Sequence, residues 1–488
     1  MVLRSRTTID DNPYTETARA AARDPELLRA LAGAKPGSFW LDDPAHDRSA
    51  PALAGRTEAD LVIVGGGYSG LWAALIAKEE DPARDVVVLE ARTLGWAASG
   101  RNGGFCAASL THGFRNGLER FEDELLLLDR LGRANLDAIE ATLLRYGVDA
   151  EFERSGGVDV ATTPWQAEDL RHEPEVAAGY GIDLEYLDRD AVQALVHSPL
   201  YQAGLVDRDR VALVHPGKLV LALADICRRL GVRFYEGTPA TEIATLGAGM
   251  RVATPYGEVV ARQVAVATSV FTSPLRRIRN YVVPVWDYVL MTEPLSAEQR
   301  ASIGWDGRQG IGDAANQFHY YRQSKDHRIL WGGYDAIYSY GNGTGADLEQ
   351  RPESFLKLAD HFFTTFPQLE GLNFSHAWGG AIDTCSRFSV MFTRALGGRA
   401  VYVGGFTGLG VGASRFGALT ALDLADGRET ERTCLELVRR RPIPFPPEPL
   451  RSAGIEVTRR ELARADRNDG RRGLWLRTLD RLGMGFDS

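Results

Sequence analysis

The chain contains 488 residues, of which 44% are hydrophobic and 25% are charged, and its formal net charge at pH 7 is −9. These values are ordinary for a globular protein, and the length favours two associated domains over a single core. Acidic and basic residues are interspersed along most of the chain, so we expect no cationic surface for a phosphate backbone and no nucleic-acid partner.

The cysteines and the N-terminal segment argue against further classes of protein. The four cysteines lie far apart and form no C-x-x-C pair, so neither a metal site nor a disulfide framework is expected. Residues 1–30 contain no uninterrupted apolar run, so neither a secretory signal nor a membrane span is expected. A reducing cytoplasm is the location that these features favour.

The first part of the chain predicts a strand, a glycine turn, a helix and a second strand. Residues 59–64 (ADLVIV) are apolar and rich in β-branched side chains, residues 65–70 are a glycine-rich turn, and residues 71–78 have helical character. Residues 85–89 (DVVVL) predict the second buried strand. This order predicts a right-handed parallel unit, which follows an N-terminal arm over residues 1–55.

The rest of the chain alternates helices with a second sheet and ends in a tail. A separate sheet is predicted to start at residues 155–163, and the aromatic-rich residues 281–375 predict a mixed sheet that lines a pocket. Prolines exclude a helix at residues 441–447, and residues 458–482 predict a basic helical tail. The other predicted elements are helices over 121–147, 217–230 and 417–426, strands over 232–235, 263–267 and 400–404, and a hairpin over 251–260.

The glycine turn matches the G-x-G-x-x-G pattern at Gly65, Gly67 and Gly70, with Tyr68 and Ser69 between the last two glycines. In such a turn the first glycine makes the bend, the second lets a pyrophosphate approach the backbone, and the third allows the helix to pack closely on the strand. The helix N-terminus beyond it favours an anion.

Glu90 stands at the end of the second predicted strand, twenty residues after Gly70. A carboxylate at this position can accept hydrogen bonds from both ribose hydroxyls of an adenosine. This context predicts a bound dinucleotide, in preference to a glycine turn that serves packing alone. FAD and NAD both remain open at this point.

Residues 95–105 (GWAASGRNGGF) favour FAD. The segment is too rich in small residues for a core helix, and it follows the second strand, where an isoalloxazine would extend from the pyrophosphate. Arg101 could stabilise the anionic reduced flavin, although a surface arginine is the alternative. The N–H and hydroxyl groups expected to face phosphate and ring belong to Ser99, Asn102, Gly103 and Gly104.

Residues 403–412 (VGGFTGLGVG) again place several glycines between a buried strand and a helix. This pattern predicts a backbone that approaches a flat or anionic ligand, here the flavin pyrimidine at the helix N-terminus. A simple helix entry would need only one glycine.

Together, these three segments resemble the D-amino-acid oxidase superfamily of flavoproteins. The resemblance runs over about residues 36–430 and includes HPGKLVLAL from His215 and VATSVFTSPL from Val266. Within it, GRNGGF and WGGAIDT look most like gamma-glutamylputrescine oxidoreductase and its relatives.

The resemblance implies an α/β fold in which a Rossmann-like FAD-binding domain is interleaved with an antiparallel-sheet (α+β) substrate domain. The tail over residues 431–488 would add a proline-rich linker and a basic helix. The implied FAD-binding domain comprises residues 56–150, 205–275 and 376–430, and the implied substrate domain comprises residues 151–204 and 276–375.

Non-covalent FAD is the cofactor that the resemblance implies. Relatives that attach flavin through cysteine do so near the stretch that here reads Trp378-Gly379-Gly380, and Cys385 falls several residues later. The expected FAD-binding residues are Gly65, Gly67, Tyr68, Ser69, Gly70, Glu90, Ala91, Arg92, Ser99, Gly100, Arg101, Asn102, Gly103, Gly104, Gly405, Phe406, Gly408, Leu409 and Gly410.

The implied reaction is oxidation of the C–N bond of an amine or amino acid. A hydride passes to flavin N5, water hydrolyses the imine, and O2 is the expected electron acceptor. Two departures from the family pattern bear on this expectation. Gly412, with Arg415 nearby, replaces a cation that holds the substrate carboxylate, and the lysine that promotes reaction with O2 is replaced near Trp331.

Three alternatives therefore stay open: an amine dehydrogenase with another acceptor, a flavin monooxygenase, and an electron-transfer flavoprotein subunit whose basic tail docks a partner. The oligomeric state is not predicted.

An H-Y-Y-R run at residues 319–322 supplies the candidates for the substrate pocket. Alternate side chains of a strand share a face, so His319 and Tyr321 would lie opposite Tyr320 and Arg322. The alternative is that these are ordinary sheet residues. The candidate catalytic residues are Arg101, His319, Tyr321 and Trp331.

Overall fold

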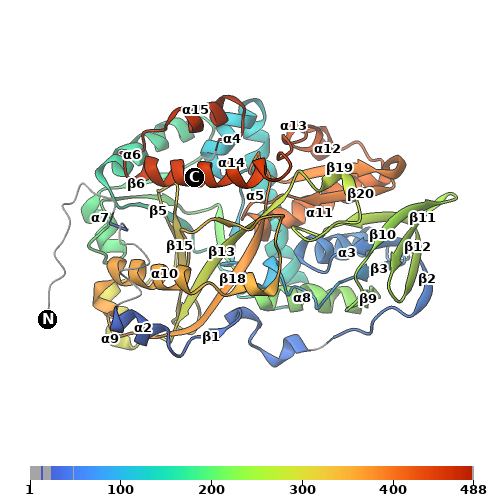
Figure 1. The fold of residues 1–488 in the computed structure, drawn as a ribbon, viewed down its shortest axis with the longest axis horizontal. Helices are drawn as coiled ribbons and strands as arrows, with labels where there is room; N and C mark the ends of the chain where they lie inside the picture. The colour runs from blue at the N-terminus through green and yellow to red at the C-terminus, as the bar shows by residue number, and fades with distance from the viewer. Residues whose placement is uncertain (1–12, 15–23, 48, 486–488) are drawn as a thin grey trace.

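The computed structural model describes residues 13–14, 24–47 and 49–485 and shows two sheets side by side with helices around them (Figure 1). Of the arm predicted over residues 1–55, residues 1–12, 15–23 and 48 lie outside the described part of the chain. Residues 486–488 of the predicted tail also lie outside it.

The first sheet has eight strands, and segments far apart in the sequence form its parallel centre. Its order is β10-β11-β12-β2-β3-β9, with β20 beside β12 and β19 beside β20. The carboxyl ends of the parallel strands meet at one edge, where ligands bind in such sheets. The parallel strands are β2 (Gly55–Val64), β3 (Val86–Leu89), β9 (Arg233–Tyr235), β12 (Gly257–Val266) and β20 (Ala400–Gly404), and the antiparallel strands are β10 (Glu242–Leu246), β11 (Gly249–Thr254) and β19 (Met391–Ala395).

Helix α3 (Tyr68–Glu80) lies between this sheet and two further helices, α8 (Pro216–Arg229) and α11 (Gly410–Asp426). Most side chains of α3 are buried, and many of them are alanine or leucine, because each face of the helix contacts a neighbouring element. Helix α5 (Leu125–Tyr146) packs against α11 and ends at Gly147, whose φ of 63° closes the helix at the predicted residue.

The second sheet has ten strands in the order β1-β18-β13-β16-β15-β14-β5-β7-β6, with β17 beside β13. Most neighbours are antiparallel, and β1–β18 and β14–β5 are parallel. Its strands are β1 (Lys35–Pro36), β5 (Gly157–Ala161), β6 (Glu185–Leu187), β7 (Ala203–Asp207), β13 (Val283–Thr292), β14 (Gly310–Asp313), β15 (His319–Gln323), β16 (Ile329–Gly333), β17 (Ile337–Tyr338) and β18 (Phe374–Thr384). A short pair, β4 (Phe105–Ala107) with β8 (Val211–Leu213), forms a third sheet.

Helix α10 (Pro352–Thr365) covers one face of the second sheet, where Phe362 packs edge-on against Trp331 with 5.7 Å between ring centroids. The opposite face turns towards the first sheet and leaves the space that holds the candidate site. The remaining helices that precede β14 in the described chain are α2 (Pro25–Leu31), α4 (Gly113–Phe121), α6 (Pro164–Ala178), α7 (Arg189–Leu195) and α9 (Ala297–Ile303).

The C-terminal segment forms two short helices, α12 (Glu431–Cys434) and α13 (Glu436–Arg439), followed by α14 (Leu450–Asp466) and α15 (Leu474–Arg481). The prediction of one basic helix over 458–482 is therefore wrong, because a turn that contains Gly470 (φ 72°) separates α14 from α15.

Within α15, Leu476 is buried, whereas Leu474 is 84% exposed.

The α/β fold class is confirmed, and the boundaries of several elements differ from the prediction. The helix predicted from residue 417 begins at Gly410, because Gly410 and Gly412 adopt helical conformation. The strand segments predicted at 258–260 and 263–267 belong to one strand, β12, which pairs with β2 along its length. Because β18 belongs to the second sheet, the domain boundary expected at residue 376 falls inside a strand.

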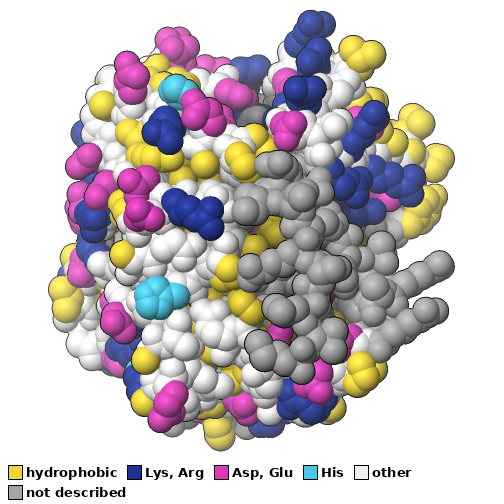
Figure 2. All heavy atoms as spheres, turned by 90° about the vertical axis from the view of Figure 1, so that its left-hand side faces the viewer, with side chains coloured by type: hydrophobic (Ala, Val, Ile, Leu, Met, Phe, Trp, Pro, Cys, Tyr) yellow, Lys and Arg dark blue, Asp and Glu magenta, His cyan; other side chains and the backbone are white. Residues whose placement is uncertain are grey.

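Charged side chains of both signs are interspersed on the face drawn in Figure 2, with Lys and Arg gathered towards one edge. Within the described part of the chain, no helix combines the length and apolar character that a membrane span requires. The four cysteines are free thiols, and the described residues contain no cluster of His, Cys, Asp and Glu suited to a metal ion.

Candidate functional site

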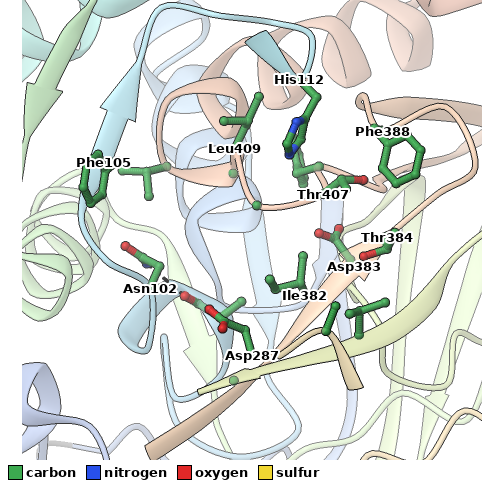
Figure 3. A pocket seen from close by; sticks show the side chains of 18 of the residues that line it. Asn102, Phe105, His112, Asp287, Ile382, Asp383, Thr384, Phe388, Thr407 and Leu409 are labelled. Atoms are coloured by element: carbon green, nitrogen blue, oxygen red, sulfur yellow. Dashed lines mark hydrogen bonds between the residues drawn. The ribbon is translucent and has the colours of Figure 1, made fainter. Parts of the chain in front are cut away.

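A cavity of about 1340 Å³ lies between the two sheets. The turn after β2, the segment 95–105 and the loop before α11 line one side of it, one face of the second sheet lines another, and α14 and α15 contribute to its wall. Figure 3 shows Asn102, Asp287 and Asp383, from three distant segments, around the same space. The volume exceeds that of a typical pocket for one small ligand, so it has room for a dinucleotide and a substrate.

The glycine turn after β2 has the geometry of a phosphate cradle. A Cβ atom on Gly65, whose φ is +114°, would lie 2.3 Å from the carbonyl oxygen of Ala267, and one on Gly67 would lie 2.8 Å from Ser99 Oγ. Gly67 also precedes α3 as a cap without a side chain. The glycines therefore add no side chains of their own where the positive end of α3 meets the cavity, and the Ser99 hydroxyl accepts from Tyr68 N there (2.9 Å). This arrangement suits a pyrophosphate.

Glu90 connects this turn to the following segment. Its Oε2 accepts a hydrogen bond from Gly66 N (2.7 Å), and its Oε1 accepts from Arg92 N (2.8 Å) and Trp96 Nε1 (3.0 Å). Burial raises the pKa of Glu90, an effect that these donors oppose. The carboxylate lines the cavity at the end of β3, where the ribose of a dinucleotide is expected.

Three side chains outside the segment 95–105 donate hydrogen bonds to three consecutive backbone carbonyls within it. Ser38 Oγ donates to Gly100 O (2.7 Å), Trp378 Nε1 donates to Arg101 O (2.9 Å), and Trp40 Nε1 donates to Asn102 O (2.8 Å).

These hydrogen bonds fix the backbone of a segment that has few side chains of its own. The segment could be predicted from the sequence, but the roles of Ser38 and Trp378 could not, because their partners are backbone atoms that no local pattern reveals.

Replacing Trp40 with Phe should loosen this segment, because the Phe ring remains while the carbonyl of Asn102 loses its donor. A buried acceptor without its partner costs about 1–3 kcal/mol, so we expect FAD affinity to fall about tenfold. A fluorescence titration of apoprotein with FAD measures this change. Trp305→Phe is the matched control, since the indole N–H of Trp305 is buried and has no partner among the described residues. Unchanged affinity in Trp40→Phe would show that this hydrogen bond does not position the segment.

Arg101 lines the cavity, but its charge is already paired. Its guanidinium forms an ion pair with Glu349 (2.8 Å) and donates to Trp96 O (2.9 Å) and Gly379 O (3.0 Å). The guanidinium therefore braces the segment 95–105 internally and ties it to Glu349 and to β18.

Asp383 on β18 holds the glycine loop that precedes α11. Its Oδ2 accepts from Gly405 N (2.7 Å), and its backbone oxygen accepts from Thr407 N (3.2 Å). Burial raises the pKa of Asp383 to about 6, against the loop N–H groups that lower it. Asp383 is a site residue that was not predicted from the sequence, because its partner Gly405 lies twenty-two positions further along the chain.

The structure brings most of the expected cofactor residues to one cavity. Those that line it are Gly65, Gly67, Tyr68, Ser69, Glu90, Ala91, Arg92, Ser99, Arg101, Asn102, Gly103, Phe406, Gly408, Leu409 and Gly410. Gly70, Gly100, Gly104 and Gly405 lie behind this lining, where they shape the turns.

Tyr320 and Asp287 face the cavity beside the segment 95–105. A Cβ atom on Gly103 would lie 2.7 Å from Cε2 of Tyr320, and the Tyr320 hydroxyl donates to Asp287 Oδ2 at 2.5 Å. Burial raises the pKa of Asp287 to about 7, although hydrogen bonds from Tyr320 and from backbone N–H groups oppose the shift. The pair therefore offers a carboxylate that changes its charge near neutral pH.

The predicted catalytic residues of the second sheet lie on the other face, against α10. His319 Nδ1 is 2.6 Å from Asp313 Oδ2, Tyr321 is hydrogen-bonded to the Tyr201 hydroxyl (2.6 Å), and the Trp331 ring stacks on His319. None of the three candidates lines the cavity.

The predicted alternation along β15 is correct, but the face that meets the cavity is that of Tyr320. Periodicity pairs residues on a face without telling which face meets the cavity. Arg415 lies close in sequence to Gly412, where relatives place a cation for the substrate carboxylate. Its guanidinium packs over Trp72 and does not line the cavity.

Comparison with known proteins gives consistent matches. Residues 60–423 match the family model described as DAO, FAD dependent oxidoreductase. Gamma-glutamylputrescine oxidoreductase of Escherichia coli (strain K12) is 31% identical over 75% of this chain and 84% of its own length, and a probable oxidoreductase, OrdL, of Rhizobium meliloti (strain 1021) is 28% identical over 84% and 93%. The crystal structure of glycine oxidase from Geobacillus kaustophilus shares the fold, with a TM-score of 0.63, 20% identity, and coverage of 77% of this chain and 96% of that one.

Proposed function

Because this chain belongs to the DAO family of FAD-dependent oxidoreductases, we propose that it oxidises the C–N bond of an amine bound in the cavity between its two sheets. FAD is the cofactor, and when bound it accepts the hydride from the carbon next to the amine nitrogen. The glycine turn, Glu90 and the loop before α11 would hold it. The observation that carries the proposal is the Tyr320–Asp287 pair, which opens into the same cavity as these cofactor residues.

Asp287 supplies the proton acceptor that amine oxidation needs. An amine enters as an ammonium ion and must lose a proton before its α-carbon can release a hydride. The Tyr320 hydroxyl can accept that proton while it passes its own to Asp287 Oδ2, at a hydrogen-bond length of 2.5 Å. Arg101, His319, Tyr321 and Trp331 are then not the residues that act on the amine.

Apolar groups complete the substrate side of the cavity. Phe105 and Val289 line it near Tyr320, and Leu450 and Val457 of α14 line it from the tail. Such walls exclude water and orient the C–H bond that breaks. The imine product is hydrolysed by water to a carbonyl compound and an amine.

An anaerobic screen of primary and secondary amines tests this proposal, with flavin absorbance as the readout. Below pH 7 the Asp287 carboxyl is protonated and cannot accept a proton, so the rate of flavin reduction should rise with pH through about 7. Failure of every amine to reduce the flavin, together with rapid reduction by NADPH alone, would favour a flavin monooxygenase and contradict the proposal.

The electrons are proposed to pass on to O2. A second candidate acceptor, another electron carrier, is favoured by one observation: no lysine lines the cavity among the described residues. Admitting air after anaerobic reduction separates the two cases. Flavin that reoxidises within seconds indicates an oxidase, and flavin that stays reduced until an artificial acceptor is added indicates a dehydrogenase.

A further inference from the structure

Asp159 on β5 faces the cavity in the same cross-strand row as Tyr320. Gly312 pairs with Tyr320 on one side and with Asp159 on the other. Directly paired residues point to the same face of a sheet, and Asp159 and Tyr320 both line the cavity. The residue between them has no side chain, and the Asp159 carboxylate leans over it: a Cβ on Gly312 would lie 3.2 Å from Asp159 Oδ1.

Among the described residues, the Asp159 carboxylate has no partner. No described group forms a hydrogen bond or an ion pair with it, although its side chain is exposed to the cavity. The carboxylates around it are paired: Asp169 and Glu173 with Arg115, and Asp207 with Arg210. A carboxylate that faces the cavity among further acidic side chains and has no counter-charge favours a cation supplied by a ligand.

The charged groups around Asp159 favour a cation as its ligand. Glu173 of α6, Asp207 of β7 and Asp313 of β14 act on it as like charges, and Arg115 of α4 opposes them. Burial first, and then Glu173 and Asp207, raise the pKa of Asp159 to about 7. A positive group that approaches this carboxyl would therefore stabilise its ionised form and lower its pKa.

The distance across the sheet sets the length of such a ligand. The Tyr320 hydroxyl reaches over Gly332 of β16 towards Asp287, since a Cβ on Gly332 would lie 2.8 Å from that hydroxyl. Strands β15 and β14 lie between β16 and β5. Three strand spacings of about 4.8 Å therefore place the Tyr320 hydroxyl roughly 14 Å from Asp159.

We propose that Asp159 binds a distal ammonium group of the substrate, so that the amine oxidised beside Tyr320 belongs to a long diamine or polyamine. This inference rests on the function proposed above and narrows its substrate class. It also disfavours amino acids, because the cavity-lining arginines at this end, Arg115 and Arg210, already pair with carboxylates.

Three amines with the same number of carbon atoms test the proposal on the holoenzyme: diaminooctane, octylamine and aminooctanoate, whose far ends are a cation, a methyl group and an anion. Rates of anaerobic flavin reduction should give diaminooctane a kcat/KM about 10- to 100-fold above that of octylamine, with aminooctanoate lowest. In Asp159→Asn this preference should disappear while the rate with octylamine stays within about twofold of wild type. Asp190→Asn, an exposed carboxylate on α7, is the control and should keep the preference.

The pH dependence gives a readout that a purely structural role would not produce. The ratio of the two rates, diaminooctane over octylamine, cancels the ionisation of Asp287 and of the reacting amine. In wild type this ratio should fall as pH drops below about 7, because Asp159 becomes neutral, and in Asp159→Asn it should be flat.

Equal rates for diaminooctane and octylamine in wild type would overturn the inference and leave the proposed function standing. An equal loss with both amines in Asp159→Asn would also overturn it. If no amine reduces the flavin, the proposed function fails. The change in flavin spectrum on adding diaminooctane then still decides the cation site: its loss in Asp159→Asn supports the site, and its persistence refutes it.

Discussion

Replacing Asp287 with Asn is expected to slow amine-dependent flavin reduction at pH 7 by about 10²- to 10⁴-fold. The amide keeps the shape of the side chain and can still contact the Tyr320 hydroxyl, but it cannot accept a proton. The rise of the rate near pH 7 should disappear as well, because the group with a pKa of about 7 is gone. Stopped-flow absorbance of the bound flavin under anaerobic conditions measures both effects.

Adjacent tyrosines provide the control for this result. Tyr320→Phe removes the hydroxyl that donates to Asp287 and should slow reduction about tenfold or more. Tyr321→Phe removes a hydroxyl on the opposite face of the same strand, bonded to Tyr201, and should leave the rate within about twofold of wild type. Similar losses in the two variants would mean that the rate does not depend on which face of β15 carries the hydroxyl, contrary to the proposed site.

Gly67→Ala is expected to weaken FAD binding by about 100-fold or more, equivalent to about 2.7 kcal/mol. Its Cβ would stand 2.8 Å from Ser99 Oγ, in the bare part of the turn where the pyrophosphate approaches. Gly33→Ala, where a Cβ meets nothing within 4 Å, is the control. The flavin content of the purified variants and the Kd from titration with FAD measure the effect. Wild-type affinity in Gly67→Ala would contradict the assignment of this turn to the cofactor.

The elements that hold the cofactor could be predicted from local sequence. The run at 59–64, the turn at 65–70 and the strand at 85–89 each carry their signal within a few residues, and the structure has them in place. Glu90 follows from its position at the end of a strand, which requires only the order of elements.

The substrate side could not be predicted in the same way. Alternation along 319–322 separated Tyr320 from Tyr321, yet the choice of face depends on α10, which follows more than thirty residues later. Asp287 acquires its role from contact with Tyr320 across β16, and a contact between distant strands leaves no local pattern.

The tail shows a further limit of local reasoning. Its composition indicated a basic helix, but the sequence does not reveal that α14 contributes Leu450 and Val457 to the wall of the cavity. This segment lies beyond residue 423, where the match to the family model ends. Its contribution to the cavity wall is therefore a feature that the family model does not cover.

The most direct test is the visible spectrum of the freshly purified protein before and after anaerobic addition of diaminooctane. We predict the absorbance of oxidised flavin, non-covalently bound and close to one FAD per chain, and its loss when the diamine is added. A folded protein that is colourless and takes up no FAD, or bound FAD that every amine leaves oxidised, would contradict the assignment of the cavity to amine oxidation.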